Sequence, residues 1–301
     1  MSAPATRSGR ASFTEPPPRY QLPADLRLGP VRLQVADVKR SIGYYERVIG
    51  LRVLRSEGSV AILGAQNDDT PLIALHERAA AMPVPRRGRL GLFHYAILLP
   101  DRASLGRFLA HLSRLGEYAG MSDHLVSEAI YLTDPDGLGI EVYADRPRTA
   151  WRMQGRSIAI ASLPLDAQNL VRAGEGVAWT GAPRGTRIGH VHLHVSDLDD
   201  AAAFYHVGLG FDKVVLDYPG ALFLSAGGYH HHLGTNTWAA GTARAADADA
   251  RLLEWTIELP SEKDVYEAAQ SLAVSGHQIA HDGDDAVSVD PWGVGVRITT
   301  G

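Results

Sequence analysis

The segment LGPVRLQVADVKRSIGYYERVIGL at residues 28–51 recurs later in the chain as IGHVHLHVSDLDDAAAFYHVGLGF at residues 188–211. The identical positions all keep one constant separation: Gly29 and Gly189, Val31 and Val191, Leu33 and Leu193, Val35 and Val195, Asp37 and Asp197, Tyr45 and Tyr205, and Gly50 and Gly210. Self-similarity at a fixed spacing indicates that a structural unit has been duplicated. This repeat is the feature from which the fold is predicted.

Two fainter repeats extend the pattern to the rest of the chain. The segment LTDPDGLGIEVY at residues 132–143 is similar to SVDPWGVGVRIT at 288–299, and FHYAILLP at 93–100 is similar to LEWTIELP at 253–260. The sequence therefore predicts four modules joined in the middle by residues 146–186. Their approximate ranges are 28–80, 90–145, 187–240 and 251–300.

The order of elements inside a module follows from local patterns. Polar and apolar residues alternate over 189–197, which is the period of a strand with two different faces. Asp197 is typical of a helix N-cap, and Gly208 or Gly210 of the end of that helix. Several short apolar runs broken by glycine follow, so each module is predicted to fold as strand, helix and three strands.

Composition limits the classes of function. The chain of 301 residues has 29 Lys and Arg against 34 Asp and Glu, a net charge of −5, which argues against nucleic acid or an anionic membrane as the main partner. It has no apolar run long enough to span a membrane. There is no cysteine, so disulfides and thiolate metal sites are excluded, whereas there are 13 histidines. Any metal must be held by nitrogen and oxygen.

His94, His190 and Glu141 carry the strongest indication of chemistry. The two histidines lie near the start of the first predicted strand of the second and third modules. Glu141 lies in the last predicted strand of the second module, where a buried carboxylate needs a partner because an unpaired buried charge is costly. Two imidazoles and one carboxylate form the facial triad that holds non-haem Fe(II) and leaves coordination positions open.

Each of these residues also has an ordinary structural alternative, since a single histidine on a strand is more often a hydrogen-bonded polar residue than a ligand. The equivalent positions of the first and fourth modules carry Pro30, Glu254 and Arg297, and an arginine cannot ligate a cation. We therefore hypothesise that modules two and three form one cup that holds the ligands, and that modules one and four form a second cup without them.

The repeated starts G-[HP]-V-x-L-x-V-x-D and the ending D-P-D-G-x-G-I-E resemble the vicinal oxygen chelate superfamily over about residues 27–300. Within it, residues 124–147 and 225–238 look closest to the extradiol ring-cleaving dioxygenases of the two-domain bacterial catechol 2,3-dioxygenase type. The resemblance implies an α+β fold of four βαβββ modules with cupped, mostly antiparallel sheets. It also implies a division into a flexible arm at 1–26, a first domain at 27–148, a linker at 149–186 and a second domain at 187–301.

Site residues follow from the resemblance one at a time. The metal ligands of the family match His94, His190 and Glu141. An acid–base histidine that precedes the D-P-D-G turn matches His124, and another falls within 230–232. For this second histidine we choose His231. On a strand, alternation would place the side chains of His230 and His232 on the opposite face.

A tyrosine that many family members carry before the turn is replaced here by Thr133, with Tyr131 two residues earlier on the same face. Other side chains could line the site or serve only in packing: His192 and His194 on the His190 strand, and the aromatic residues Tyr143, Trp151, Tyr229 and Trp238.

The resemblance implies a metal-dependent dioxygenase with Fe(II), or Mn(II) as the alternative. It would bind a small aromatic diol and O₂ and produce a ring-opened semialdehyde, with His124 moving a proton and His231 stabilising charge on reduced oxygen. Two alternatives stay open: a glyoxalase-type isomerase or lyase, and a non-enzymatic binding or resistance protein. The expected setting is a cytoplasmic homo-oligomer involved in aromatic catabolism, with neither nucleic acid nor membrane as a partner.

Overall fold

Each of the four predicted modules forms the expected strand, helix and three strands in the computed structural model, which describes residues 14–301. The first module comprises β1 (Arg27–Val35), α1 (Val38–Tyr44), β2 (Arg52–Glu57), β3 (Val60–Gly64) and β4 (Pro71–Glu77). The second comprises β5 (Gly91–Leu98), α2 (Arg102–Leu115), β6 (Gly120–Asp123), β7 (Ser127–Thr133) and β8 (Gly139–Asp145). The predicted α+β class is confirmed.

The second half of the chain repeats this order. The third module comprises β11 (Arg187–His194), α4 (Leu198–Ala201), β12 (Asp212–Val215), β13 (Ala221–Ser225) and β14 (Leu233–Asn236). The fourth comprises β15 (Arg251–Leu259), α5 (Glu262–Val274), β16 (Ala280–Asp282), β17 (Asp285–Val289) and β18 (Gly295–Thr300). The connecting segment contains a short hairpin, β9 (Met153–Gln154) and β10 (Ser157–Ile158), and the helix α3 (Ala167–Ala173).

The module helices begin at side-chain caps. In each case the cap oxygen accepts a hydrogen bond from a backbone N–H of the first turn, and the caps are Asp37, Asp101, Asp197 and Ser261. The predicted cap at Asp197 is therefore confirmed. The helix that follows it continues as a π-helical stretch, Ala202–Gly208, and Gly210 then adopts a φ of 99° that favours glycine.

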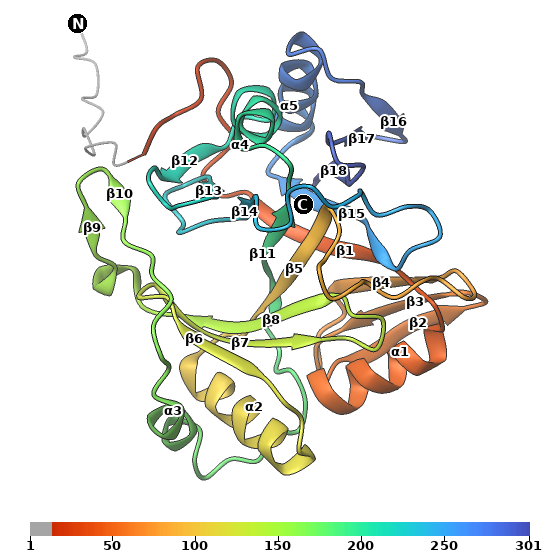
Figure 1. Cartoon of the computed structure of the whole chain (residues 1–301), viewed down its shortest axis with the longest axis vertical. Coiled ribbons are helices and arrows are strands. Elements are labelled where there is room, and N and C mark those ends of the chain that lie inside the picture. Colours follow the sequence, from red (N-terminus) through yellow and green to blue (C-terminus); the bar gives the residue numbers. More distant parts are fainter. Residues whose placement is uncertain (1–13) are drawn as a thin grey trace, which may run out of the picture.

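The strands form two eight-stranded sheets that each combine two modules (Figure 1). One sheet has the order β16-β17-β18-β15-β1-β4-β3-β2 and unites modules one and four. The other has the order β12-β13-β14-β11-β5-β8-β7-β6 and unites modules two and three. Each sheet thus draws strands from both ranges 27–148 and 187–301, and the division into two sequential domains stays a prediction.

First strands meet at the centre of each sheet. β1 pairs with β15 and β5 with β11, both antiparallel, and each first strand pairs in parallel with the last strand of its own module. In β11 the register shifts at Gly189, where an added Cβ would lie 1.8 Å from the Tyr143 hydroxyl. The repeated glycine lets the β8 side chain pass against the β11 backbone.

A second kind of contact links modules that are neighbours in sequence. The hydroxyl of Tyr45 donates to Asp134 at 3.3 Å, and the equivalent Tyr205 donates to the equivalent Asp290 at 2.7 Å. Both aspartates are buried at the start of a D-P-x-G turn and accept hydrogen bonds from backbone N–H groups of that turn. The repeated Tyr and Asp therefore join module one to module two, and module three to module four.

The predicted N-terminal arm is described only in part, because residues 1–13 lie outside the described residues. Glu15 exchanges two backbone hydrogen bonds with Lys213 of β12, at 3.0 and 2.9 Å. Leu22 is buried, and its N–H donates to the Gly210 carbonyl at 2.9 Å. The described part of the arm thus contacts the third module at Glu15 and Leu22, and the Tyr20 hydroxyl donates to the Asp264 carbonyl of α5 at 3.3 Å.

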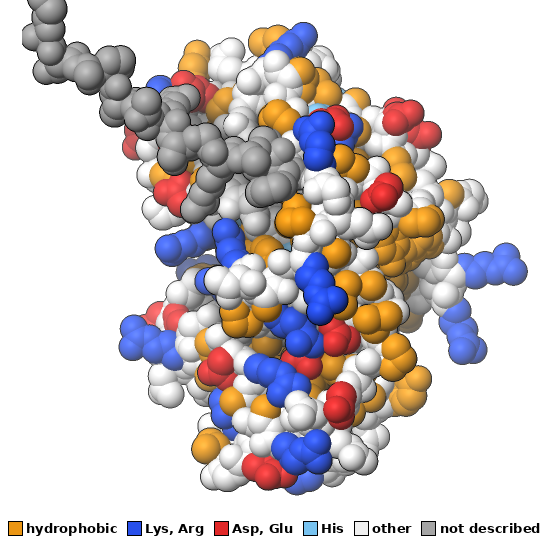
Figure 2. Space-filling model, turned by 90° about the vertical axis from the view of Figure 1, so that its left-hand side faces the viewer, with side chains coloured by type: hydrophobic (Ala, Val, Ile, Leu, Met, Phe, Trp, Pro, Cys, Tyr) orange, Lys and Arg blue, Asp and Glu red, His pale blue; other side chains and the backbone are white. Residues whose placement is uncertain are grey.

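One face of the molecule carries interspersed charge (Figure 2). On the face drawn in Figure 2, basic and acidic side chains are mixed rather than gathered into one large patch. Within residues 14–301, no helix is long and apolar enough to cross a membrane.

The Tyr–Asp links predict a stability effect far from the candidate site. Asp290→Ala removes the acceptor of Tyr205 and of two buried backbone N–H groups, so we expect the free energy of unfolding to fall by about 2–4 kcal/mol. Urea denaturation followed by circular dichroism measures it. The control is Asp284→Ala, an exposed acidic residue of the neighbouring turn, which should change stability by less than about 0.5 kcal/mol. Equal effects of the two substitutions would contradict the structural role of the link.

Candidate metal centre

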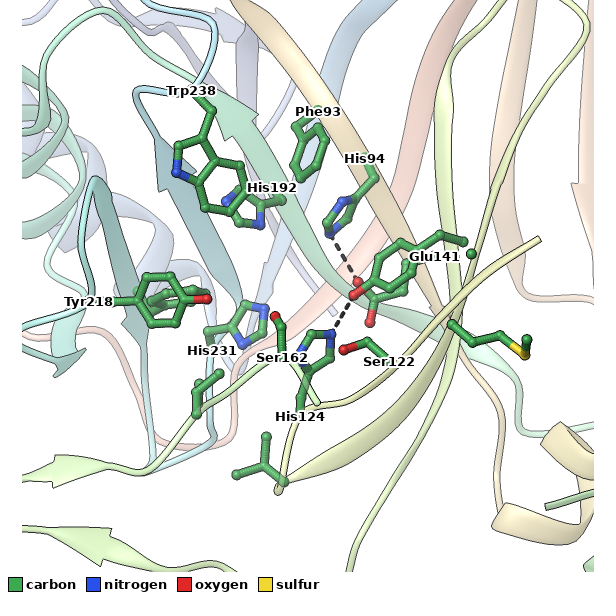
Figure 3. A pocket seen from close by; sticks show the side chains of 16 residues that line it. Phe93, His94, Ser122, His124, Glu141, Ser162, His192, Tyr218, His231 and Trp238 are labelled. Carbon is green, nitrogen blue, oxygen red and sulfur yellow. Dashed lines mark hydrogen bonds and ion pairs between the residues drawn. The ribbon is translucent and has the colours of Figure 1, made fainter. Parts of the chain in front are cut away.

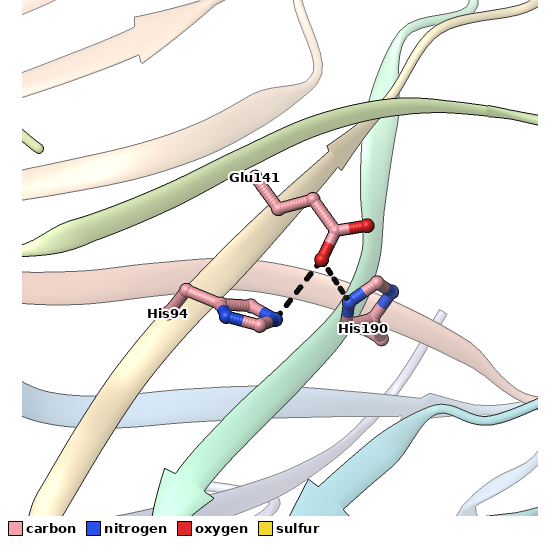
Figure 4. Close-up of side chains that lie close together, drawn as sticks. All are labelled: His94, Glu141 and His190. Atoms are coloured by element: carbon pink, nitrogen blue, oxygen red, sulfur yellow. Dashed lines mark hydrogen bonds and ion pairs between the residues drawn. The ribbon is translucent and has the colours of Figure 1, made fainter. Parts of the chain in front are cut away.

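Three neighbouring strands bring His94, Glu141 and His190 together. β5 lies between β11 and β8, and it carries His94. Ala96 of β5 pairs with His190 on one side and with Glu141 on the other, so all three side chains project from one small area of the sheet (Figure 4). Residues far apart in sequence thus meet because the first strands of modules two and three pair.

The three side chains are buried and their ligand atoms are close. Exposure is 5% for His94, 2% for Glu141 and 1% for His190. Glu141 Oε2 lies 3.0 Å from His94 Nε2 and 3.1 Å from His190 Nε2. One possible ligand atom of each residue lies within 4.8 Å of the others. This arrangement can hold one metal ion.

The electrostatics fit a cation at this place. Burial lowers the pKa of His94, which favours the neutral imidazole that ligates metals. Burial alone would raise the pKa of Glu141, but the neighbouring His190 and His94 outweigh it and hold that pKa well below its usual range. Nδ1 of His94 and Nδ1 of His190 are buried without a hydrogen-bond partner, while Nε2 of each ring lies beside the Glu141 carboxylate. Unsatisfied imidazole nitrogens beside a buried carboxylate match the donor set for a divalent cation.

A pocket of about 380 Å³ opens beside His94 and Glu141 (Figure 3). Its walls are mainly apolar and include Phe93, Val126, Ile160, Phe223 and Trp238. A volume of this size falls in the range typical of small-molecule sites. Two of the predicted ligands, His94 and Glu141, therefore border a cavity that can accept an aromatic molecule.

His124 lies in this pocket with a defined hydrogen-bond pattern. Its Nδ1 lies 2.7 Å from the Ala161 carbonyl, which only accepts, so Nδ1 carries the proton. Its Nε2 lies 2.5 Å from the hydroxyl of Tyr131, which donates to it. Tyr131 pairs with Glu141 across the β7–β8 ladder and also lines the pocket. Thr133, at the position of the family tyrosine, lines a neighbouring cleft instead.

The three consecutive histidines lie in the turn before β14 and not in a strand, so the expected strand alternation does not apply to them. His231 lines the pocket, and its ring centroid lies 4.2 Å from that of His190. His230 and His232 are not among the lining residues. His230 bonds Asp145, and His232 Nδ1 lies 3.0 Å from the Ser225 hydroxyl. The structure therefore places His231, and neither neighbour, at the pocket.

The remaining candidates divide between the pocket and the core. His192 and Trp238 line the pocket, and the amide of Asn236 donates to His192 Nε2 at 3.0 Å. Tyr143 and Tyr229 are buried outside it, with their hydroxyls 2.7 Å apart. Of the aromatic residues singled out in the sequence, some therefore line the pocket and others pack in the core.

The connecting segment contributes residues that sequence reasoning missed. Ile160 and Ser162 line the pocket, and the carbonyl of Ala161 between them orients His124. The segment lies outside every repeat and holds no motif, so no sequence signal could have assigned it to the site.

The sheet of modules one and four carries ion pairs at the equivalent positions. Arg297, equivalent to Glu141, donates from Nε to Glu254, equivalent to His94, at 2.8 Å. The same guanidinium bonds Asp285 at 2.7 Å and Asp282 at 2.9 Å. The side chains expected to have lost metal binding thus satisfy one another.

Comparison with known proteins agrees with the resemblance found in the sequence. A family model described as the Glyoxalase/Bleomycin resistance protein/Dioxygenase superfamily matches residues 27–142 and 187–292. The catechol-2,3-dioxygenase of Bacillus subtilis (strain 168) is 43% identical over 259 residues, which cover 85% of this chain and 90% of that protein.

Two solved structures show the same fold. A putative dioxygenase from Bacillus subtilis subsp. subtilis str. 168 matches with a TM-score of 0.66 and 14% identity, over 93% of this chain and 86% of that one. Glyoxalase I from Zea mays matches with a TM-score of 0.53 and 18% identity, over 91% and 92%. Identities this low are evidence of shared architecture and not of shared activity.

The site predicts loss of metal affinity on removal of any one ligand. Glu141→Gln and His94→Ala should each weaken Fe(II) or Mn(II) binding at least about 10–100-fold, because a ligand matters at least as much as the residues behind it. Anaerobic titration followed by elemental analysis measures the bound metal. The control is His281→Ala, an exposed histidine of β16. Full metal content in either ligand variant would overturn the assignment.

Proposed function

The chain belongs to the glyoxalase/bleomycin resistance protein/dioxygenase superfamily, and from this premise we propose that it is an extradiol ring-cleaving dioxygenase. The reaction joins a catechol and O₂ and opens the ring beside the two hydroxyls to give a semialdehyde. The observation that carries the proposal is the buried His94–Glu141–His190 set, the three ligands that the described residues bring together, of which His94 and Glu141 border a cavity of about 380 Å³.

The metal we propose is Fe(II), with Mn(II) as the alternative, held by His94, Glu141 and His190. When bound, such an ion supplies a Lewis acid and an electron donor with coordination positions free for substrate and O₂. The protein holds these ligands on three paired strands, which position them more rigidly than loops would.

Besides holding the metal ion, the chain supplies a group that can move a proton. A catechol must lose a proton from a hydroxyl when it binds a cation. The proton of His124 lies on Nδ1, which donates to the Ala161 carbonyl. Nε2 therefore has a free lone pair once a substrate displaces the Tyr131 hydroxyl. We assign the general base to His124, with Tyr131 as the hydroxyl that occupies it in the absence of substrate.

The third contribution is to select the substrate. Of the described residues that line the pocket, none is arginine or lysine, and most of the wall is apolar. A carboxylate on the ring would be buried there without a cation, which is costly. The cavity also exceeds what one unsubstituted ring needs. We therefore propose catechols with uncharged, apolar substituents as the substrate class.

A glyoxalase-type reaction is less well supported by the same residues. Such sites commonly use a fourth protein ligand, often a second carboxylate. The buried Glu128 is held by Arg102 and Arg146, and Asp145 bonds His230. Neither carboxylate lines the pocket, so we assign no fourth ligand.

The direct test is ring cleavage. Protein purified anaerobically and loaded with Fe(II) should turn catechol and O₂ into a yellow semialdehyde, followed by visible absorbance and by oxygen uptake. Glu141→Gln should abolish the reaction, while His281→Ala should leave it unchanged. Iron-loaded protein that cleaves no catechol, yet isomerises a thiohemiacetal, would overturn the proposal in favour of a glyoxalase.

Specificity gives a second test. We expect kcat/KM for 4-methylcatechol to exceed that for 3,4-dihydroxybenzoate at least about 100-fold, because the pocket leaves the carboxylate unpaired. A neighbouring cleft of about 600 Å³ is lined by Arg86 and Arg87. Preference for the carboxylated catechol, lost in Arg86→Ala/Arg87→Ala, would contradict the apolar class and move the substituent into that cleft.

A further inference from the structure

A line of hydrogen bonds runs from the pocket through two adjacent histidines to an aspartate on the strand that carries Glu141. His231 Nδ1 lies 2.7 Å from His230 Nδ1, and His230 Nε2 lies 2.9 Å from Asp145 Oδ1. We propose that Asp145 and His230 are positioning residues that keep the proton of His231 on Nδ1 and leave its Nε2 lone pair for a ligand in the pocket. The proposal deepens the function proposed above and rests on it only for the identity of that ligand.

The direction of each hydrogen bond follows from the acceptor at the far end. A carboxylate only accepts, so His230 donates to Asp145 from Nε2. A neutral imidazole carries one N–H, so His230 Nδ1 is then an acceptor. The hydrogen between the two rings therefore belongs to His231 Nδ1, and Nε2 of His231 has none.

Both imidazoles of this line are buried. His230 is 0% exposed and His231 is 8% exposed. Burial, followed by the neighbouring His190 and His230, lowers the pKa of His231 well below its usual range.

Asp145 is itself held in place. The Tyr229 hydroxyl donates to the same Oδ1 at 3.2 Å, and Tyr229 is in turn within 2.7 Å of the Tyr143 hydroxyl. Asp145 is the final residue of β8, four positions after Glu141. One strand thus carries both a predicted metal ligand and the carboxylate that orients a second histidine.

The consequence for the pocket is a matched pair of acceptors. His124 presents Nε2 as an acceptor because its Nδ1 donates to Ala161, and His231 presents Nε2 as an acceptor because its Nδ1 donates to His230. Figure 3 shows both rings at the pocket beside Glu141. Two imidazole lone pairs suit a ligand with two adjacent hydroxyl donors. The charge-stabilising role expected from the resemblance would instead need an N–H on His231.

Two-bond ¹H–¹⁵N correlation NMR on metal-free protein with ¹⁵N-labelled histidine tests the proposal without an activity measurement. We expect His231, identified by its loss in His231→Gln, to show a protonated Nδ1 and an unprotonated Nε2 at neutral pH. A protonated Nε2 would overturn the proposal, since it would mean that His230 donates to His231.

Substitutions of Asp145 then test whether this carboxylate fixes the tautomer of His231. Asp145→Asn keeps an oxygen acceptor and should retain the tautomer, whereas Asp145→Ala removes it and should give mixed tautomers. In the iron-loaded enzyme we expect kcat to fall about 10–100-fold in Asp145→Ala with KM within about twofold, and to recover in Asp145→Asn.

The matched control is His232→Gln, on the same segment but bonded to Ser225, which should change neither readout. An unchanged tautomer in Asp145→Ala would overturn the positioning role. A correct tautomer in a protein that cleaves no catechol would leave this inference standing and reject only the proposed function.

Discussion

The antiparallel pairing of β5 with β11 is the constraint on which the candidate site depends. These are the first strands of modules two and three, and their register places His94 two residues from the partner of His190. Parallel pairing of β5 with β8 then adds Glu141 beside Ala96. Because side chains alternate along a strand, a slip of one residue would send a ligand to the other face of the sheet. The chemistry of the site is therefore fixed by strand register.

The modules are joined in two different ways, and this crosswise joining holds the sheets together. Sheets unite modules two with three and one with four, whereas the Tyr–Asp links unite one with two and three with four. Every module thus contacts one partner through a ladder and another through a buried hydrogen bond. Two pairs of repeated positions, Tyr45 with Tyr205 and Asp134 with Asp290, make the second kind of contact.

The repeat predicts the modules, their element order and the cap at Asp197, because all of these depend on short-range patterns. Strand alternation is wrong for His230–His232, because these residues precede β14 and the rings of His230 and His231 are hydrogen-bonded to each other. Local sequence patterns could not predict that Ile160 and Ser162 line the pocket or that the Ala161 carbonyl orients His124. Those contacts come from an irregular segment whose path is set by long-range packing, and no periodicity encodes such a path.

The three buried glutamates show how one electrostatic problem is solved in different ways. Glu128 is paired with Arg102 and Arg146, and Glu254 with Arg297 and Arg32, so each has a permanent cation beside it. Glu141 is the most buried of the three, and its ion-pair partners are the imidazoles of His94 and His190. Burial lowers the pKa of His94, so this imidazole is a weaker source of positive charge than an arginine. A divalent ion between these groups can supply that charge, and this need for a cation is the physical reason to expect a metal in one sheet and not in the other.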